Sequence, residues 1–342
     1  MPYTPLLPWY DANKRVLPFR GTRDPYAIWV SEIMLQQTRT ETVSGYFLRF
    51  MQRFPSVTAL AQADEQEVLK YWEGLGYYSR ARNLHKAARL IEHEYGGRFP
   101  QSYEAIRALP GIGDYTAAAV SSIAYQLPYP AIDGNLTRVI SRVHGVREDV
   151  DIPSVKRQIR ALADEHIDQT RPGDWNQALM DLGATICLPG TPDCARCPLQ
   201  GKCDAHAQDD ADMLPVRAAA KPPLPVEMGV ALVTCDNKIL MQKRDASLLK
   251  GLWVFILNEN DATIDGMQKK LRTLGVQARF TADLGEARHI FTHRIWNMHI
   301  YHFIADMPRA KAGCEWVTTD DLIALPLPTA VKAAKAHALK LI

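Results

Sequence analysis

The amino-acid sequence predicts a multidomain protein in which an all-α region precedes an α+β domain. Three observations support this fold class. The chain has 342 residues, which is more than one average domain. Apolar residues recur at helical spacing through residues 1–208. Segments that alternate with period two begin only after residue 226, where strands are therefore expected.

Composition narrows the function classes only slightly. A hydrophobic content of 47% and a charged content of 23% are ordinary for a globular protein. The net charge of +2 is far from the strong excess of positive charge that is typical of nucleic-acid-binding proteins. DNA binding therefore has to be argued from motifs. We see neither a signal peptide nor an apolar run long enough for a membrane span. We therefore expect a cytoplasmic protein that does not bind membranes and keeps its six cysteines reduced or metal-bound.

The all-α region has a clear helix start at Asp24-Pro25, an N-cap acceptor followed by proline at the first helical position. Apolar residues then continue at helical spacing from Ile28 to Phe50. This pattern predicts a helical segment through that stretch. Further helices are expected over 65–72, 81–94, 102–109, 116–125, 136–143 and 155–163.

A linker separates the two regions. Residues 205–225 are rich in Ala, Asp and Pro, and we place the boundary segment at 209–226. In 227–342 we expect a hairpin with arms 227–234 and 239–243 around Cys235-Asp236-Asn237-Lys238. Further strands are expected at 251–257 and 296–305, and helices at 264–274 and 329–341.

Four cysteines lie in one short segment, residues 187–203, with the spacing C-x6-C-x2-C-x5-C: Cys187, Cys194, Cys197 and Cys203. Such clustering in a reducing compartment indicates a metal centre. A structural zinc site and a [4Fe–4S] cluster both use four thiolates. A single C-x2-C pair favours iron–sulfur modestly and leaves zinc open. Cys235 and Cys314 stand apart and are interpreted as small buried residues.

The cysteine spacing is similar to that of the endonuclease III and MutY glycosylases, and this resemblance implies one [4Fe–4S] cluster. The resemblance extends over nearly the whole chain and is strongest over 25–203. It implies an all-α helix–hairpin–helix glycosylase core over 1–208 and a Nudix-like domain over 227–342.

A second motif is the turn Leu109-Pro110-Gly111-Ile112-Gly113, which joins two helices within 102–125. Glycines permit positive φ and let phosphate approach backbone N–H groups at the next helix start. The motif resembles a helix–hairpin–helix that holds duplex DNA through Gly111 and Gly113, although glycine at a helix junction is more often plain turn chemistry. We expect the acidic side chain of Asp114 to point away from phosphate.

Position 115 separates two branches of the resembling enzymes. In the bifunctional glycosylase/lyases this position holds a lysine that attacks the sugar as an amine. Tyr115 cannot form a Schiff base. The resemblance therefore implies a monofunctional adenine DNA glycosylase of the MutY type.

Two carboxyl groups stand in contrasting local contexts. Asp133 precedes a helix within Asp133-Gly134-Asn135-Leu136-Thr137-Arg138-Val139, where backbone donors and the helix dipole should keep it ionised. Glu32 lies two turns into an apolar helix, where desolvation should raise its pKa. An N-cap and a buried structural Glu are the plain alternatives. One ionised and one protonated carboxyl group is the pattern of glycosidic-bond chemistry.

The resemblance assigns roles to these residues. Glu32 would protonate N7 of adenine, and Asp133 would stabilise the oxocarbenium ion. Tyr115 and Asn135 would support the transition state and position Asp133 or water. Because a base inside a duplex cannot be reached, the adenine would be flipped out. The DNA-contacting residues implied at the resulting gap are Gln36, Gln37, Thr38 and Tyr77; a polar helix end and a packed aromatic are competing interpretations.

The C-terminal region resembles the Nudix-like domain that recognises 8-oxoguanine opposite adenine. Residues 251–255 match its G-L-W-x-F strand, whereas residues 267–271 lack the acids needed to hold Mg²⁺. A nucleotide pyrophosphatase is therefore disfavoured. Phe291-Thr292-His293 matches the family's Phe-Ser-His turn, with Thr292 in place of serine; an ordinary strand edge is an equal alternative for Thr292 and His293.

Taken with the resemblance, these motifs predict a base-excision repair enzyme. It would remove adenine paired with 8-oxoguanine or guanine in double-stranded DNA, acting as a monomer in the bacterial-type nucleoid. An endonuclease III-like lyase is disfavoured by Tyr115 and by the C-terminal domain. A non-catalytic DNA-binding module with a redox cluster is disfavoured by the presence of both Glu32 and Asp133.

Overall fold

The computed structural model describes residues 2–219, 221–259 and 261–342. Its internal contacts divide the chain into two compact units. The first consists of Met1–Ala63 and Arg82–Ala219, and the second of Asp64–Ala81 and Ala220–Ile342. The segment Asp64–Ala81 therefore packs with the C-terminal half of the chain, although it lies within the helical part of the sequence.

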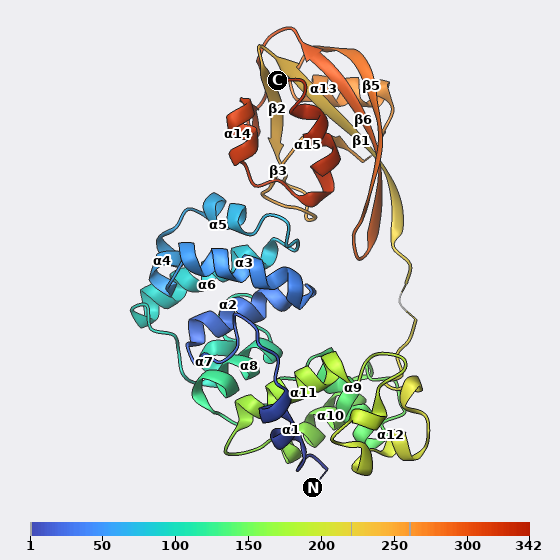
Figure 1. Cartoon of the computed structure of the whole chain (residues 1–342). Coiled ribbons are helices and arrows are strands. Elements are labelled where there is room, and N and C mark those ends of the chain that lie inside the picture. Colours follow the sequence, from blue (N-terminus) through green and yellow to red (C-terminus); the bar gives the residue numbers. More distant parts are fainter. Residues whose placement is uncertain (1, 220, 260) are drawn as a thin grey trace. The chain divides into compact units, whose positions relative to one another are not determined.

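The first unit is built from helices (Figure 1). They are α1 (Leu6–Asn13), α2 (Pro25–Leu35), α3 (Thr40–Arg53), α4 (Val57–Gln62), α6 (Ser79–Tyr95, whose first turn belongs to the second unit), α7 (Tyr103–Arg107), α8 (Asp114–Tyr125), α9 (Gly134–His144), α10 (Pro153–His166), α11 (Pro172–Thr185) and α12 (Asp204–Ala207). Short 3-10 turns cover Cys194–Arg196, Gln200–Lys202 and Ala211–Met213.

The predicted start of α2 is confirmed, because the Asp24 carboxylate accepts hydrogen bonds from the N–H groups of Tyr26 and Ala27. The helix does not continue to Phe50. It ends at Leu35, and Gln37 adopts a φ of 56° in the turn before α3. Helical spacing of apolar residues persists across this break, which is why periodicity alone did not locate it.

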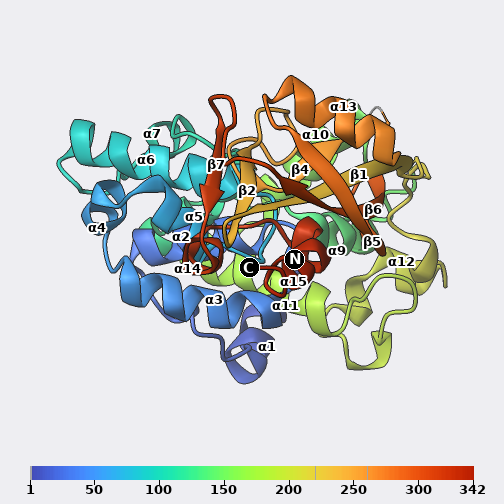
Figure 2. The same ribbon diagram turned by 90° about the horizontal axis from the view of Figure 1, so that it is seen from above.

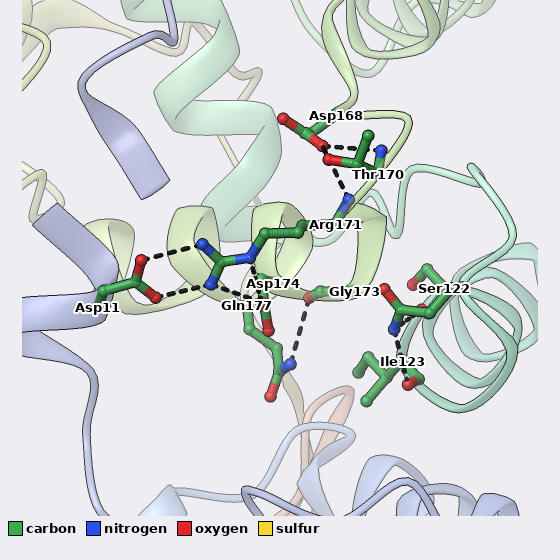
Figure 3. A network of polar contacts seen from close by, with 10 residues as sticks. Asp11, Ser122, Ile123, Asp168, Thr170, Arg171, Gly173, Asp174 and Gln177 are labelled. Carbon is green, nitrogen blue, oxygen red and sulfur yellow. Dashed lines mark hydrogen bonds and ion pairs between the residues drawn. The ribbon is translucent and has the colours of Figure 1, made fainter. Parts of the chain in front are cut away.

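Helix α11 lies at the centre of the first unit and contacts α1, α8 and α9. Almost all of its side chains are buried, so it lacks the apolar stripe that marks an amphipathic helix, and periodicity did not identify it. Gly173 permits its close approach to α8, because a Cβ atom there would lie 2.7 Å from the carbonyl oxygen of Ser122 (Figure 3).

The second unit contains a seven-stranded sheet. Its elements are α5 (Glu65–Tyr71), β1 (Leu224–Cys235), β2 (Lys238–Lys243), β3 (Trp253–Val254), β4 (Ile256–Asn258), α13 (Ile264–Thr273), β5 (Ala278–Ile290), β6 (Arg294–Ala305), β7 (Cys314–Val317), α14 (Thr319–Ala324), a 3-10 turn (Thr329–Val331) and α15 (Lys332–Ala338). The strand order is β3-β2-β1-β6-β5, with β4 also on β1 and β7 on β2. Strands β1 and β6 run parallel, and the other pairs are antiparallel.

Each face of this sheet carries its own core. Met267 and Leu271 of α13 pack with Val233 and Phe303 on one face. Leu322 of α14 and Ala334 of α15 belong to the core on the other face. Figures 1 and 2 show α13 and α15 on opposite sides of the strands. The second unit is thus a three-layer α+β structure.

The predicted hairpin of β1 and β2 is confirmed, with Thr234 paired to Ile239 and with positive φ at Asp236 and Asn237. Strand β1 begins at Leu224, inside the stretch interpreted as linker, because it pairs in parallel with β6 from Arg294 onward. The expected strand 251–257 is two short strands. Strand β5 was missed, since its polar and charged residues leave half of its side chains exposed.

Candidate active site

Glu32 is buried in α2 and is only 5% exposed. Its neighbours along α2 are also buried, so the carboxyl group lies inside the first unit, as the sequence predicted. Burial raises the pKa of Glu32, and the nearby charge of Asp133 adds to this effect. The Tyr115 hydroxyl and the Arg20 cation oppose it without reversing it. Glu32 therefore holds a proton to higher pH than an exposed glutamate.

Tyr115 lies in the first turn of α8 and contacts Glu32 directly. Its hydroxyl donates a hydrogen bond to Glu32 Oε2 at 2.5 Å. Burial, followed by the charges of Glu32 and Asp133, raises the pKa of this phenol well above its usual value. Tyr115 therefore remains a neutral hydrogen-bond donor at physiological pH.

Asp133 is the N-cap of α9. Its Oδ1 accepts the N–H of Leu136 at 2.7 Å, and its Oδ2 accepts Nδ2 of Asn135 at 2.8 Å. Burial nevertheless raises the pKa of Asp133, against these donors. The predicted backbone donors are present and lower the pKa of Asp133, but burial, which the sequence did not reveal, has the larger effect.

Arg138 fixes Asn135 from the other side. Its guanidinium donates to Asn135 Oδ1 at 2.9 Å, and to the carbonyl oxygens of Gly183 and Cys187, each at 2.7 Å. Arg138 is part of the Asp133 motif, but the sequence alone does not indicate its role. The available signal for such a role was an arginine on a helix whose other residues are mostly buried. Buried arginines are usually paired with other groups, so this position indicates a partner for Arg138.

The hairpin between α7 and α8 depends on one glycine more than the other. Gly111 has a φ of 77°, and a Cβ atom there would lie 2.5 Å from Asn83 Cβ. Gly113 has an ordinary φ of −95° and is the N-cap of α8. The Asp114 carboxylate is paired with Arg107 Nε at 2.5 Å, which explains how an acid is accommodated here.

The four clustered cysteines line a single cavity: Cys187, Cys194, Cys197 and Cys203. Arg142 lines it as well, with Nη1 lying 3.2 Å from Cys187 Sγ. Within the described ranges, no group of three or more His, Cys, Asp or Glu side chains has the geometry to hold a single metal ion. Four cysteine side chains around a common cavity, with a buried arginine beside them, are a donor set that fits an iron–sulfur cluster.

The predicted DNA-contacting residues are divided between the two units. Gln36 is the C-cap of α2, and its Nε2 donates to Thr116 Oγ1 on α8 at 3.2 Å. Gln37 and Thr38 follow in the turn. In the second unit, Tyr77 has a φ of 46°, is 47% exposed, and shares a short hydroxyl–hydroxyl contact with Thr292. His293 follows Thr292 at the β5–β6 turn.

Comparisons with known proteins support these features. Residues 30–165 match the HhH-GPD superfamily of base excision DNA repair proteins, and residues 229–337 match the NUDIX domain. The chain is 34% identical to the adenine DNA glycosylase of Mus musculus, over 96% of this chain and 76% of that protein. It is 32% identical to the Homo sapiens adenine DNA glycosylase, over 96% of this chain and 72% of the relative.

The chain belongs to the adenine DNA glycosylases. It is a base-excision repair enzyme, a hydrolase of N-glycosyl bonds. A solved thermostable thymine-DNA glycosylase is similar in structure, with a TM-score of 0.56 and 30% identity, over 60% of this chain and 94% of that one. Endonuclease III bound to DNA shares the fold, with a TM-score of 0.51 and 21% identity over 60% of this chain and 94% of that one.

Two residues of this adenine glycosylase lie at the site without having been predicted from the sequence, Arg20 and Met180. Arg20 Nη2 and Tyr115 Oη each lie 4.0 Å from Met180 Sδ. The sequence around Arg20 contains no motif that indicates a site. A charged residue in an irregular segment is ordinarily expected to be exposed to solvent. None of the described helices is both long and apolar enough to cross a membrane.

Proposed function

We propose that this glycosylase excises adenine from duplex DNA by acid-assisted hydrolysis. The buried Glu32–Tyr115 hydrogen bond carries this proposal. Glu32, with its raised pKa, gives a proton to N7 of the flipped base, so that adenine leaves as a neutral molecule. The C1′–N9 bond then breaks with its electron pair retained by the base.

Asp133 acts on the sugar in this proposal. Its carboxylate stabilises the positive charge that develops at C1′. Asn135 and Leu136 hold the two oxygens of Asp133 in place, and Arg138 in turn holds Asn135. Water adds to C1′ and loses a proton to the Glu32 carboxylate, which restores the starting state of the enzyme.

Tyr115 makes the enzyme monofunctional in our proposal. A phenol buried against Glu32 cannot form the Schiff base that a lyase requires. The glycosylase should therefore release adenine and leave the DNA strand intact. A glycosylase/lyase would nick the strand without added alkali.

Access to the base requires DNA contacts. Gly111 and Gly113 present backbone N–H groups to phosphate at the start of α8. Gln36, Gln37, Thr38 and Tyr77 enter or line the gap left by the flipped base. Thr292 and His293 read the opposite base, with 8-oxoguanine preferred to guanine, and the enzyme works as a monomer in the nucleoid.

The cysteine cavity would hold one [4Fe–4S] cluster through Cys187, Cys194, Cys197 and Cys203. When bound, the cluster would link the 187–203 segment covalently at four points. Arg142 would compensate its negative charge from the buried side. None of the proposed chemical steps passes through it.

The experiment is single-turnover excision on two duplexes that differ only in the base opposite adenine, 8-oxoguanine or guanine. Adenine release without strand scission before alkali treatment would support the proposal. Strand scission without alkali, or release of a different base, would contradict it. Parallel assays on duplexes with thymine or cytosine at the target position test the choice of base.

A further inference from the structure

Asp181 is a buried carboxylate in α11 that stands between two arginines. It is only 2% exposed. Its Oδ1 accepts Arg15 Nε at 2.8 Å, and its Oδ2 accepts the Arg15 backbone N–H at 3.1 Å. Arg20 Nη2 lies 3.6 Å from the same Oδ1. One buried anion thus faces two cations from the segment between α1 and α2.

Arg20 connects this ion cluster to the catalytic pair. Its Nη2 packs against Met180 Sδ, and the Tyr115 hydroxyl packs against the same sulfur atom, each at 4.0 Å. Tyr115 in turn donates to Glu32. The side chains form a continuous path from Asp181 through Arg20 and Met180 to the proton donor.

An arginine beside a general acid has a cost. A positive charge favours the ionised carboxylate, and a carboxylate has no proton to give. Arg20 acts in this direction on both Glu32 and Tyr115. A negative charge beside Arg20 reduces the net positive field at Glu32, and low polarity around the cluster lets it act over several ångströms.

We infer that Asp181 is a positioning residue for the proton donor: it fixes Arg20 beside the Glu32–Tyr115 pair and offsets its charge, so that Glu32 stays protonated for catalysis. This inference rests on the proposed role of Glu32 as the acid.

Other ionisable groups also lie around Asp181, Arg15 and Arg20 and around Glu32. Glu32 is influenced by Tyr115 of α8, by Arg20 and by Asp133 at the start of α9. The charges of Arg20, Asp181 and Asp174 act on Tyr10 of α1, which hydrogen-bonds Arg20. Among the ion pairs of the described residues, Asp181 is thus the buried acid that pairs directly with Arg20.

The test is the pH profile of single-turnover adenine excision by the full-length enzyme carrying Asp181→Asn, Asp181→Glu or Asp11→Asn. Asp11→Asn is the matched control: Asp11 accepts two hydrogen bonds from Arg171, at 2.6 and 2.9 Å, and also joins the N-terminal segment to α11 (Figure 3). Melting temperatures and active-site titration are recorded for each variant, so that unfolded protein does not enter the rates.

In Asp181→Asn the alkaline limb should move to lower pH by about one unit, a tenfold loss of rate at fixed pH on that limb. Asp181→Glu should restore most of the wild-type profile, and Asp11→Asn should keep it unchanged. If the alkaline limb of folded Asp181→Asn stays in place or moves to higher pH, the inference is overturned. Asp181 would then have a purely structural role. Absence of adenine release by the wild-type enzyme would instead refute the proposed function.

Discussion

The Tyr115 hydroxyl and the Glu32 carboxyl group are joined by a 2.5 Å hydrogen bond between α8 and α2. The bond favours the ionised carboxylate, whereas burial favours the protonated acid, and burial has the larger effect. The structure therefore combines a donor that orients the acid with surroundings that raise the pKa of the acid. This balance is the basis of the first two predictions.

Glu32→Gln should reduce excision by about 10²–10⁴-fold, the usual contribution of a general acid. Glutamine preserves the shape and can still accept from Tyr115, so binding of a mispaired duplex should change little. Single-turnover rates and equilibrium binding on the same duplex provide the measurement. Excision at a wild-type rate would remove Glu32 from the mechanism.

The same substitution should stabilise the protein at neutral and alkaline pH. The raised pKa of Glu32 means that the native state keeps a proton which the unfolded chain releases above a pH of about 4.3. The free energy of unfolding attributable to this group therefore falls as pH rises toward the raised native pKa, and stays low above it. Glutamine carries no such dependence. The melting temperatures of the wild-type and Glu32→Gln proteins, measured at increasing pH, should therefore diverge as pH rises. Melting temperatures that change in parallel would contradict the prediction.

Asp133→Asn should abolish most excision while α9 remains intact. Asparagine caps a helix about as well as aspartate, so the cap on Leu136 is kept, while the negative charge facing the sugar and the acceptor for Asn135 are lost. We expect at least about a hundredfold loss of rate, which corresponds to about 2.7 kcal/mol. Asp64→Asn, at the N-cap of α5, is the matched control and should keep its activity. A comparable loss in both variants would point to folding rather than chemistry.

The cysteine cavity predicts a brown protein after anaerobic purification, with about four iron and four sulfide ions per chain. Elemental analysis and visible absorption provide the measurement. Replacement of Cys197 by Ser should lower the bound iron and destabilise the 187–203 segment, whereas Cys314→Ser should not. Stoichiometric zinc without iron would contradict the cluster assignment.

The double variant Thr292→Ala/His293→Ala should lose preference for adenine opposite 8-oxoguanine over adenine opposite guanine. The expected change is about 1–3 kcal/mol, roughly five- to 150-fold, because one base-edge contact is removed and the acid is untouched. Thr273→Ala, a surface threonine of α13, is the control. Measured on both duplexes, an unchanged preference in folded protein would mean that the opposite base is read elsewhere.

Local sequence determined much of the candidate site. Asp24-Pro25 specified the start of α2, and this start sets the turn on which Glu32 lies. The Asp133 motif specified a cap, and Tyr115 specified the absence of a lysine at that position. The hairpin of β1 and β2 followed from its turn residues. Each of these features depends on contacts within a few residues, which a local pattern can encode.

Tertiary packing decided the rest. It alone brought Glu32, Tyr115, Met180 and Arg20 together from α2, α8, α11 and the preceding segment. It buried Asp133, and this burial raises the pKa of the carboxyl group against its capping donors. It also placed Asp64–Ala81 with the C-terminal half and paired β1 with β6. The sequence by itself determined which chemical groups are present and how each is capped locally. Their desolvation and their long-range partners depend on which surfaces exclude water from each other, and only the folded chain fixes that.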